Sequence, residues 1–132
     1  MNLPHGMDGQ GPEHSSGRME RYLQMMSDSW VDLYKDGGLE TEKPLRNTNM
    51  SVICCSTASN IFHSYRRQLR RDYRKPLISF VNKKLLKSKD ALSSFSELNK
   101  DKFETVIDDS TVIAKDVSRI VLCYGQAYYA AL

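Results

Sequence analysis

Cysteine, tryptophan and net charge are all scarce in this sequence. Its 132 residues include three cysteines and one tryptophan, and the formal net charge is only +3. Cys54 and Cys55 are adjacent and Cys123 is distant, so no spacing matches a metal site, a CxxC redox motif or a disulfide framework. We therefore expect reduced thiols in an intracellular protein. The charge is too small to indicate nucleic-acid binding by itself.

Long hydrophobic runs are also missing. The longest apolar stretch, residues 120–132, is interrupted by Gly125 and Gln126, whereas a membrane-spanning helix needs about 18 consecutive apolar residues. The N-terminus has neither the basic flank and apolar run of a secretory signal nor the Arg-rich composition of a mitochondrial presequence. These absences predict a cytoplasmic protein without a transmembrane anchor.

The motifs of enzyme active sites are absent too. The sequence contains no Gly-rich phosphate loop and no nucleophile elbow. His63 has no metal-binding partner four residues later, so we interpret it as a surface or packing residue. Asp108 and Asp109 are adjacent and point to different sides of a helix, which favours a solvated face over an acid–base pair. We expect a protein that is not an enzyme, with no cofactor and no small-molecule substrate.

The composition changes after residue 17. Residues 1–17 hold four glycines, two prolines, two histidines and two serines, and they have too little apolar surface to offset the entropy of ordering. We expect a disordered N-terminal arm over residues 1–17 and one helical domain over residues 18–132.

Apolar residues recur at helical spacing along that domain. The spacing predicts a first helix from Met19 to Tyr34, ended by Gly37 and Gly38. A second helix is expected over residues 51–75, where Pro76 breaks it. A shorter helix is expected over residues 77–86, and a short helix or irregular crossing over residues 88–99.

Two further helices are predicted near the C-terminus. Asn99 and Asp116 are the expected N-caps, and the helix over residues 116–128 is apolar around most of its circumference, which is typical of a centrally buried helix. No alternating strand or hairpin pattern is present. The predicted fold class is all-α, a small helical bundle around a central hydrophobic helix.

A basic run ends the second predicted helix and continues beyond it. It could contact phosphates, but acidic residues crowd the rest of the chain, so we favour a solvated helix face. A basic helical module that binds nucleic acid or acts as an adaptor is kept as an alternative. The run comprises Arg66, Arg67, Arg70, Arg71, Arg74, Lys75, Lys83, Lys84, Lys87 and Lys89.

One segment resembles the first homology region of the B-cell-lymphoma-two (Bcl-two) family of apoptosis regulators. Residues 103–109, Phe-Glu-Thr-Val-Ile-Asp-Asp, followed by residues 116–121, Asp-Val-Ser-Arg-Ile-Val, are similar to that family's Phe-x-x-Val-(Val/Ala)-(Glu/Asp)-(Glu/Asp) and Asn-Trp-Gly-Arg-(Ile/Val)-Val. Asp116, Val117 and Ser118 depart from the family pattern. Residues 57–69 resemble the third homology region more weakly.

The resemblance implies a hydrophobic groove that binds the amphipathic helix of pro-apoptotic partners. Arg119 would pair with an aspartate of that helix, Asp116 would cap the central helix, and Ser118 would narrow the groove. Plain core packing is the alternative role for the apolar residues. The implied apolar lining consists of Ile61, Tyr65, Leu69, Phe103, Val106 and Val121.

The function implied by the resemblance is that of a pro-survival apoptosis regulator of a virus-encoded or otherwise trimmed kind, cytoplasmic or peripheral to mitochondria. A pro-apoptotic member of the same family remains an alternative, as does the basic module. Nucleic acid is the less favoured partner. A homodimer is expected if the apolar central helix is exposed and needs cover.

Overall fold

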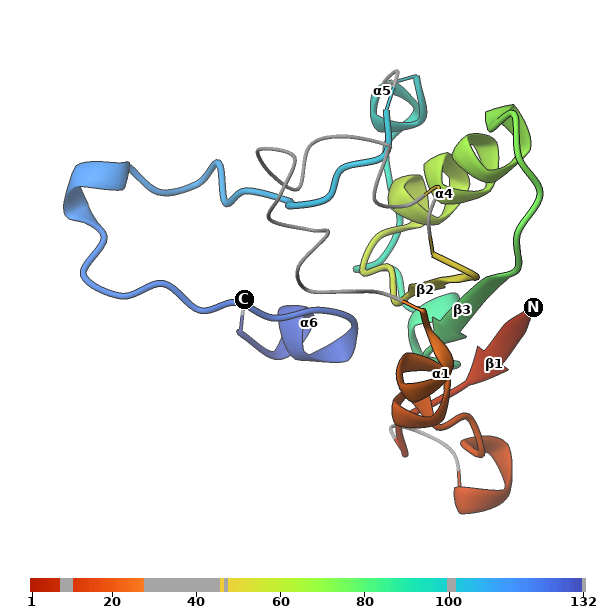
Figure 1. Ribbon diagram of the computed structural model, residues 1–132. Helices are drawn as coiled ribbons and strands as arrows, with labels where there is room; N and C mark the ends of the chain where they lie inside the picture. Colours follow the sequence, from red (N-terminus) through yellow and green to blue (C-terminus); the bar gives the residue numbers. More distant parts are fainter. Residues whose placement is uncertain (8–10, 28–45, 47, 100–101, 132) are drawn as a thin grey trace.

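The computed structural model describes residues 1–7, 11–27, 46, 48–99 and 102–131. At its centre is a three-stranded parallel sheet made of β1 (Asn2–Pro4), β2 (Ser51–Ile53) and β3 (Leu77–Val81), in the order β1-β3-β2. Figure 1 shows α4 (Ala58–Arg70) running over this sheet and α1 (Met19–Met25) lying next to it. The predicted all-α bundle is therefore wrong, and the fold is α/β.

The central strand is a run of five residues, Leu-Ile-Ser-Phe-Val, directly after Pro76. Ile78, Ser79 and Phe80 are all buried, and Phe80 is only 1% exposed. A parallel strand covered on both faces is mostly apolar rather than alternating, and here only the small Ser79 interrupts the apolar residues. The helix predicted over residues 77–86 is wrong, because periodicity cannot separate a short buried strand from a short buried helix. A single 3-10 turn follows at Leu85–Lys87.

The second predicted helix is divided in two by the structure. Residues 51–53 form β2, where β-branched Val52 and Ile53 favour a strand. The helix itself, α4, begins after Thr57, whose side-chain oxygen accepts a hydrogen bond from the backbone N–H of Asn60 at 3.3 Å. The prediction of a helix is confirmed for residues 58–70. Because β2, α4 and β3 follow one another, they form a parallel strand–helix–strand unit.

The N-terminal residues form the other edge strand. Asn2–Pro4 pair in parallel with Ser79–Val81 of β3, and the phenol of Tyr65 on α4 donates a hydrogen bond to Asn2 Oδ1 at 2.8 Å. Residues 1–17, expected to be a disordered arm, thus include β1 and a 3-10 turn at Pro12–His14.

The remaining helices are short. The first predicted helix begins as expected, at Met19, but its residues 28–34 and the glycines expected to end it lie outside the described residues. Within the predicted 88–99 segment, α5 (Phe95–Leu98) begins with a capping box between Ser94 and Glu97. Asn99 is the C-cap of this helix and not an N-cap.

The predicted central hydrophobic helix does not form. Residues 114–116 make a 3-10 turn, residues 117–124 have no helix or strand, and only α6 (Gln126–Ala131) is helical. Figure 1 shows the segment between α5 and α6 reaching away from the sheet and returning. The buried hydrophobic residues in the described part are instead Ile78, Phe80 and Ala91. None of the described helices is long and apolar enough to cross a membrane.

Candidate active site at the carboxyl edge of the sheet

All three strands end at the same edge of the sheet, because every pairing is parallel. Ligands of open parallel sheets bind outside the carboxyl ends of the strands. In this protein the residues that directly follow the strands are His5 after β1, Cys54 after β2 and Asn82 after β3. This edge is therefore the candidate site.

The imidazole of His5 is the first side chain after β1 at this edge. Its backbone N–H donates to the carbonyl of Val81 at 3.1 Å, which extends the β1–β3 ladder by one residue. The half-buried imidazole packs edge-on against Phe80, with the ring centroids 5.9 Å apart, and its Nε2 lies 3.9 Å from Cys54 Sγ. Gly6 follows with a φ of 76°, a conformation that glycine adopts without strain and that turns the chain out of the strand.

The chain then forms a loop that closes on itself. The backbone N–H of Gly17 donates to the carbonyl of Pro4 at 2.7 Å, and an added Cβ at Gly17 would lie 2.4 Å from that same oxygen. The loop exposes Glu13 and His14, whose side chains form an ion pair at 3.6 Å. A second imidazole and a carboxylate are thus presented on the segment that starts at His5.

The other edge residues are neutral hydrogen-bonding groups. Asn82 is buried, and its Oδ1 accepts a hydrogen bond from the backbone N–H of Lys84 at 2.8 Å. Burial, with a smaller contribution from the neighbouring Cys55, raises the pKa of the Cys54 thiol to about 11. The pKa of Cys55 is also raised by burial, against the effect of a hydrogen bond with Ser64. Both thiols are therefore protonated at neutral pH.

The C-terminal end of the described chain docks beside this edge. The backbone N–H of Gly125 donates to Ser56 Oγ at 2.8 Å, and the phenol of Tyr129 on α6 donates to the carbonyl of Ser56 at 2.7 Å. A Cβ placed on Gly125 would come within 3.6 Å of Cys54 Sγ. The loop after β2 is thus hydrogen-bonded to the C-terminal segment as well as lying close to His5.

The residues expected to line a groove are not gathered into one. Ile61, Tyr65 and Leu69 lie on α4, and Leu69 is 77% exposed. Val106 and Val121 are 77% and 65% exposed on the segment between α5 and α6. The polar residues of the expected site are all exposed on that same segment; they are Asp116, Ser118 and Arg119.

Phe103 is the exception among these residues, because it contacts α4. Its ring lies under the guanidinium of Arg67, with 5.4 Å from Cζ to the centroid. It also lines a cavity of about 120 Å³ between α4, β2 and the amino-terminal end of β3. Among the residues that the structure describes, no group of three or more side chains is arranged to hold a metal ion.

Comparison with known proteins defines the class. Residues 1–89 match the family described as transketolase, pyrimidine binding domain. The chain belongs to this family. An α/β fold with a parallel sheet is consistent with that assignment.

The full-length relatives are named as one kind of enzyme. The chain is 44% identical over 128 residues to the 2-oxoglutarate dehydrogenase E1 component of Cupriavidus necator, covering 96% of this chain and 12% of that protein. It is 42% identical over 133 residues to the mitochondrial 2-oxoglutarate dehydrogenase of Dictyostelium discoideum and 40% identical over 135 residues to that of Saccharomyces cerevisiae. Each of these two alignments covers 98% of this chain and 13% of the relative. The chain thus spans about one eighth of the length of these relatives.

These findings overturn the Bcl-two resemblance and what it implied. The apoptosis functions, the helix-binding partner and the alternative basic module are all wrong. The expectations of a protein that is not an enzyme and has no small-molecule substrate are wrong too, because the relatives are dehydrogenases named after 2-oxoglutarate. The similarity rested on residues 103–121, a short pattern of apolar and acidic residues that lies outside the matched family segment.

Sequence reasoning missed His5, because the residues around it were assigned to a disordered arm. The local signal was weak: Leu3 and Pro4 precede His5 and Gly6, and a glycine in such a place can mark a turn. Val52 and Ile53 precede Cys54, but no glycine follows there. Only the pairing of both segments with β3 shows that these two side chains meet.

Proposed function

We propose that this chain is part of an E1-type 2-oxo acid dehydrogenase that acts on 2-oxoglutarate, and that its carboxyl edge contributes His5 to the active site. The observation that carries the proposal is the position of His5. It is an imidazole fixed at the end of β1, at the edge where parallel sheets bind their ligands. The names of the relatives supply the reaction and the substrate.

The chemistry of that reaction explains what such an edge is for. When a 2-oxo acid loses CO2, the bond between the carboxyl carbon and the carbonyl carbon breaks, and its electron pair stays on the carbonyl carbon. Enzymes supply an electron sink for this pair, such as the ylid of thiamine diphosphate when that cofactor is bound. A pyrimidine-binding family fits a cofactor that contains a pyrimidine ring.

The described residues at this edge are suited to binding the substrate rather than the cofactor. His5, Cys54 and Asn82 bring an imidazole, a thiol and an amide, and none of the three is a carboxylate. An imidazole can donate a hydrogen bond or a proton to a substrate oxygen. We assign His5 to the substrate and none of these three residues to the cofactor ring.

The names of the relatives do not agree on a cellular compartment. The proteins of Dictyostelium discoideum and Saccharomyces cerevisiae are named as mitochondrial, whereas the bacterial name specifies no compartment. The cytoplasmic location expected from composition stays a prediction.

A chimeric enzyme tests the proposal. This chain replaces the aligned residues of the Cupriavidus necator E1 component, and release of CO2 from 2-oxoglutarate is measured. We expect an active chimera, and a His5→Ala version whose kcat/KM is reduced by about 100-fold, the usual contribution of a general acid or base.

His14→Ala is the matched control, because His14 is an exposed imidazole on the same loop whose only described ion pair is with its neighbour Glu13. The proposal is rejected if the chimera unfolds cooperatively, as the parent does, but does not consume 2-oxoglutarate. The assignment of His5 is rejected if His5→Ala is as active as His14→Ala.

A further inference from the structure

His5 contacts residues from two neighbouring strands at the carboxyl edge, Phe80 of β3 and Cys54 after β2. On one side the imidazole packs against Phe80, which in turn contacts the ring of Tyr22 on α1 with centroids 5.7 Å apart. On the other side Nε2 faces Cys54 Sγ at 3.9 Å. A Cβ added at Gly125 would lie 3.6 Å from the same sulfur, at van der Waals distance. The thiol therefore lies close to both the imidazole and the C-terminal segment.

We propose that Cys54 is a positioning residue for His5, whose thiol occupies Nε2 so that Nδ1 is the ring nitrogen presented to the substrate. Cys54 does not itself contact the reacting atoms. The inference rests on the proposed function, because it assumes that His5 serves the substrate.

The contacts of the ring distinguish its two nitrogens. Nε2 has the thiol as its partner. Nδ1 has no hydrogen bond with any described residue, and it is not one of the buried polar atoms left without a partner. A neutral imidazole has one donor and one acceptor nitrogen, so fixing the partner of Nε2 leaves Nδ1 for a ligand.

The protonation state of the thiol supports a neutral contact. Since the pKa of Cys54 is raised to about 11, the thiolate that would pair with an imidazolium does not form at neutral pH. A neutral S–H group can orient the imidazole of His5 without placing a negative charge beside it.

Cys55 provides a matched control in the same loop. It is also half-buried, and its thiol interacts with Ser64 of α4 rather than with His5. Removing either sulfur costs a similar amount of packing, but only the loss of Cys54 changes the surroundings of the imidazole.

The first test measures the imidazole directly and does not need activity. The complete chimeric enzyme is treated with diethyl pyrocarbonate, and the acylation rates of His5 and of exposed His14 are compared by mass spectrometry. In Cys54→Ala both nitrogens of His5 are open, so we expect its rate relative to His14 to rise about twofold or more. We expect no rise in Cys55→Ala.

The second test measures catalysis. Loss of orientation acts in the transition state, so Cys54→Ala should lower kcat by about tenfold or more with little change in KM. Cys54→Ser, which keeps a hydrogen-bonding group, should recover most of that loss. Cys55→Ala should match the unmodified chimera.

Two results would overturn the inference. Equal His5 acylation in Cys54→Ala and Cys55→Ala would show that the thiol does not hold the ring. A kcat that falls equally in both variants, without recovery in Cys54→Ser, would show only a packing role. If acylation of His5 rises in Cys54→Ala but His5→Ala keeps full activity, the thiol contact is real and it is the assignment of His5 to catalysis that fails.

Discussion

At the scale of single residues, Gly17 illustrates how a position without a side chain shapes the site. It brings the loop that starts at His5 back onto Pro4 through one hydrogen bond. Phe80 also lies 3.2 Å from where its Cβ would be. Gly17 thus joins the loop, the end of β1 and the core residue beneath His5.

Gly17→Ala should destabilise the protein, because the new Cβ would meet a backbone oxygen at 2.4 Å and the backbone cannot easily move away. Forced overpacking of this kind costs about 1–3 kcal/mol, which denaturant unfolding would measure. Gly11→Ala is the control, since its Cβ would meet only the flexible end of the Glu13 side chain. Equal stability of the two variants would mean that the loop is not closed as described.

At the scale of elements, what could be predicted depended on length. The 13-residue α4 carries a clear apolar period and a threonine cap, and the sequence predicted a helix there. The strands have three, three and five residues, which is too short for a period to appear. The glycines and prolines near β1 predicted disorder from composition alone. The strand is ordered because it pairs with β3, whose residues lie more than 70 positions later in the sequence.

The candidate site was unpredictable for the same reason. His5 and Cys54 are separated by 49 positions and meet only because both of their strands flank β3. The predicted apolar residues, by contrast, came from local patterns. Val106 and Val121 fit the spacing of a helix, but both are exposed and neither lies in a helix.

The N-cap of α4 can be tested on its own. Thr57→Ala removes the side-chain oxygen that accepts from the N–H of Asn60, and such a change typically costs about 1 kcal/mol of stability. Thr105→Ala provides the comparison, because that threonine is exposed outside any helix or strand. Thermal unfolding should show a lower Tm for Thr57→Ala alone; a similar decrease in both variants would argue against the cap.

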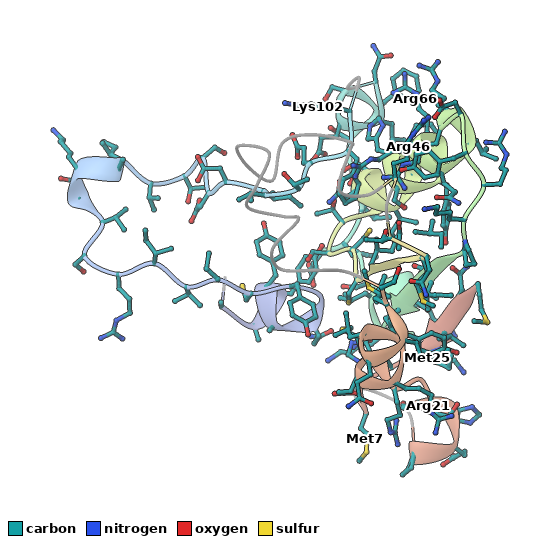
Figure 2. The ribbon with its side chains drawn as sticks, viewed as in Figure 1. Met7, Arg21, Met25, Arg46, Arg66 and Lys102 are labelled. Atoms are coloured by element: carbon teal, nitrogen blue, oxygen red, sulfur yellow. The ribbon has the colours of Figure 1, made fainter. Side chains whose placement is uncertain are left out.

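At the scale of the whole molecule, basic side chains lie at both ends of the described structure, whereas exposed apolar side chains are dense in one segment. Figure 2 places Arg46, Arg66 and Lys102 on the α4 side, far from Arg21 and Met25 beside α1. The segment from Val106 to Tyr124 exposes apolar side chains along its length; those that stand out are Val106, Ile107, Val112, Ile113, Val117, Ile120, Val121, Leu122 and Tyr124. The sheet region is the packed part of the chain, and this segment contributes little to its core.

Limited proteolysis should reveal that difference. In this chain we expect trypsin to cut first after Lys115 and Arg119, which are exposed in a segment with little secondary structure. Arg66 and Arg67 in the middle of α4 should be cut later. Mass spectrometry of the early fragments would show the order, and early cleavage within α4 would contradict this division.

The order of the strands has a consequence for how the protein is made. β1 and β2 each pair with β3 and not with each other, and β3 is the last of the three in the sequence. While the ribosome synthesises the chain, neither earlier strand has its partner until residues 77–81 emerge. Since protein synthesis adds roughly 5–20 residues per second, the backbone groups of β1 stay unpaired for several seconds. During that interval the nascent chain depends on chaperones or on solvation to avoid wrong pairing, and His5 and Cys54 come together only when the last strand arrives.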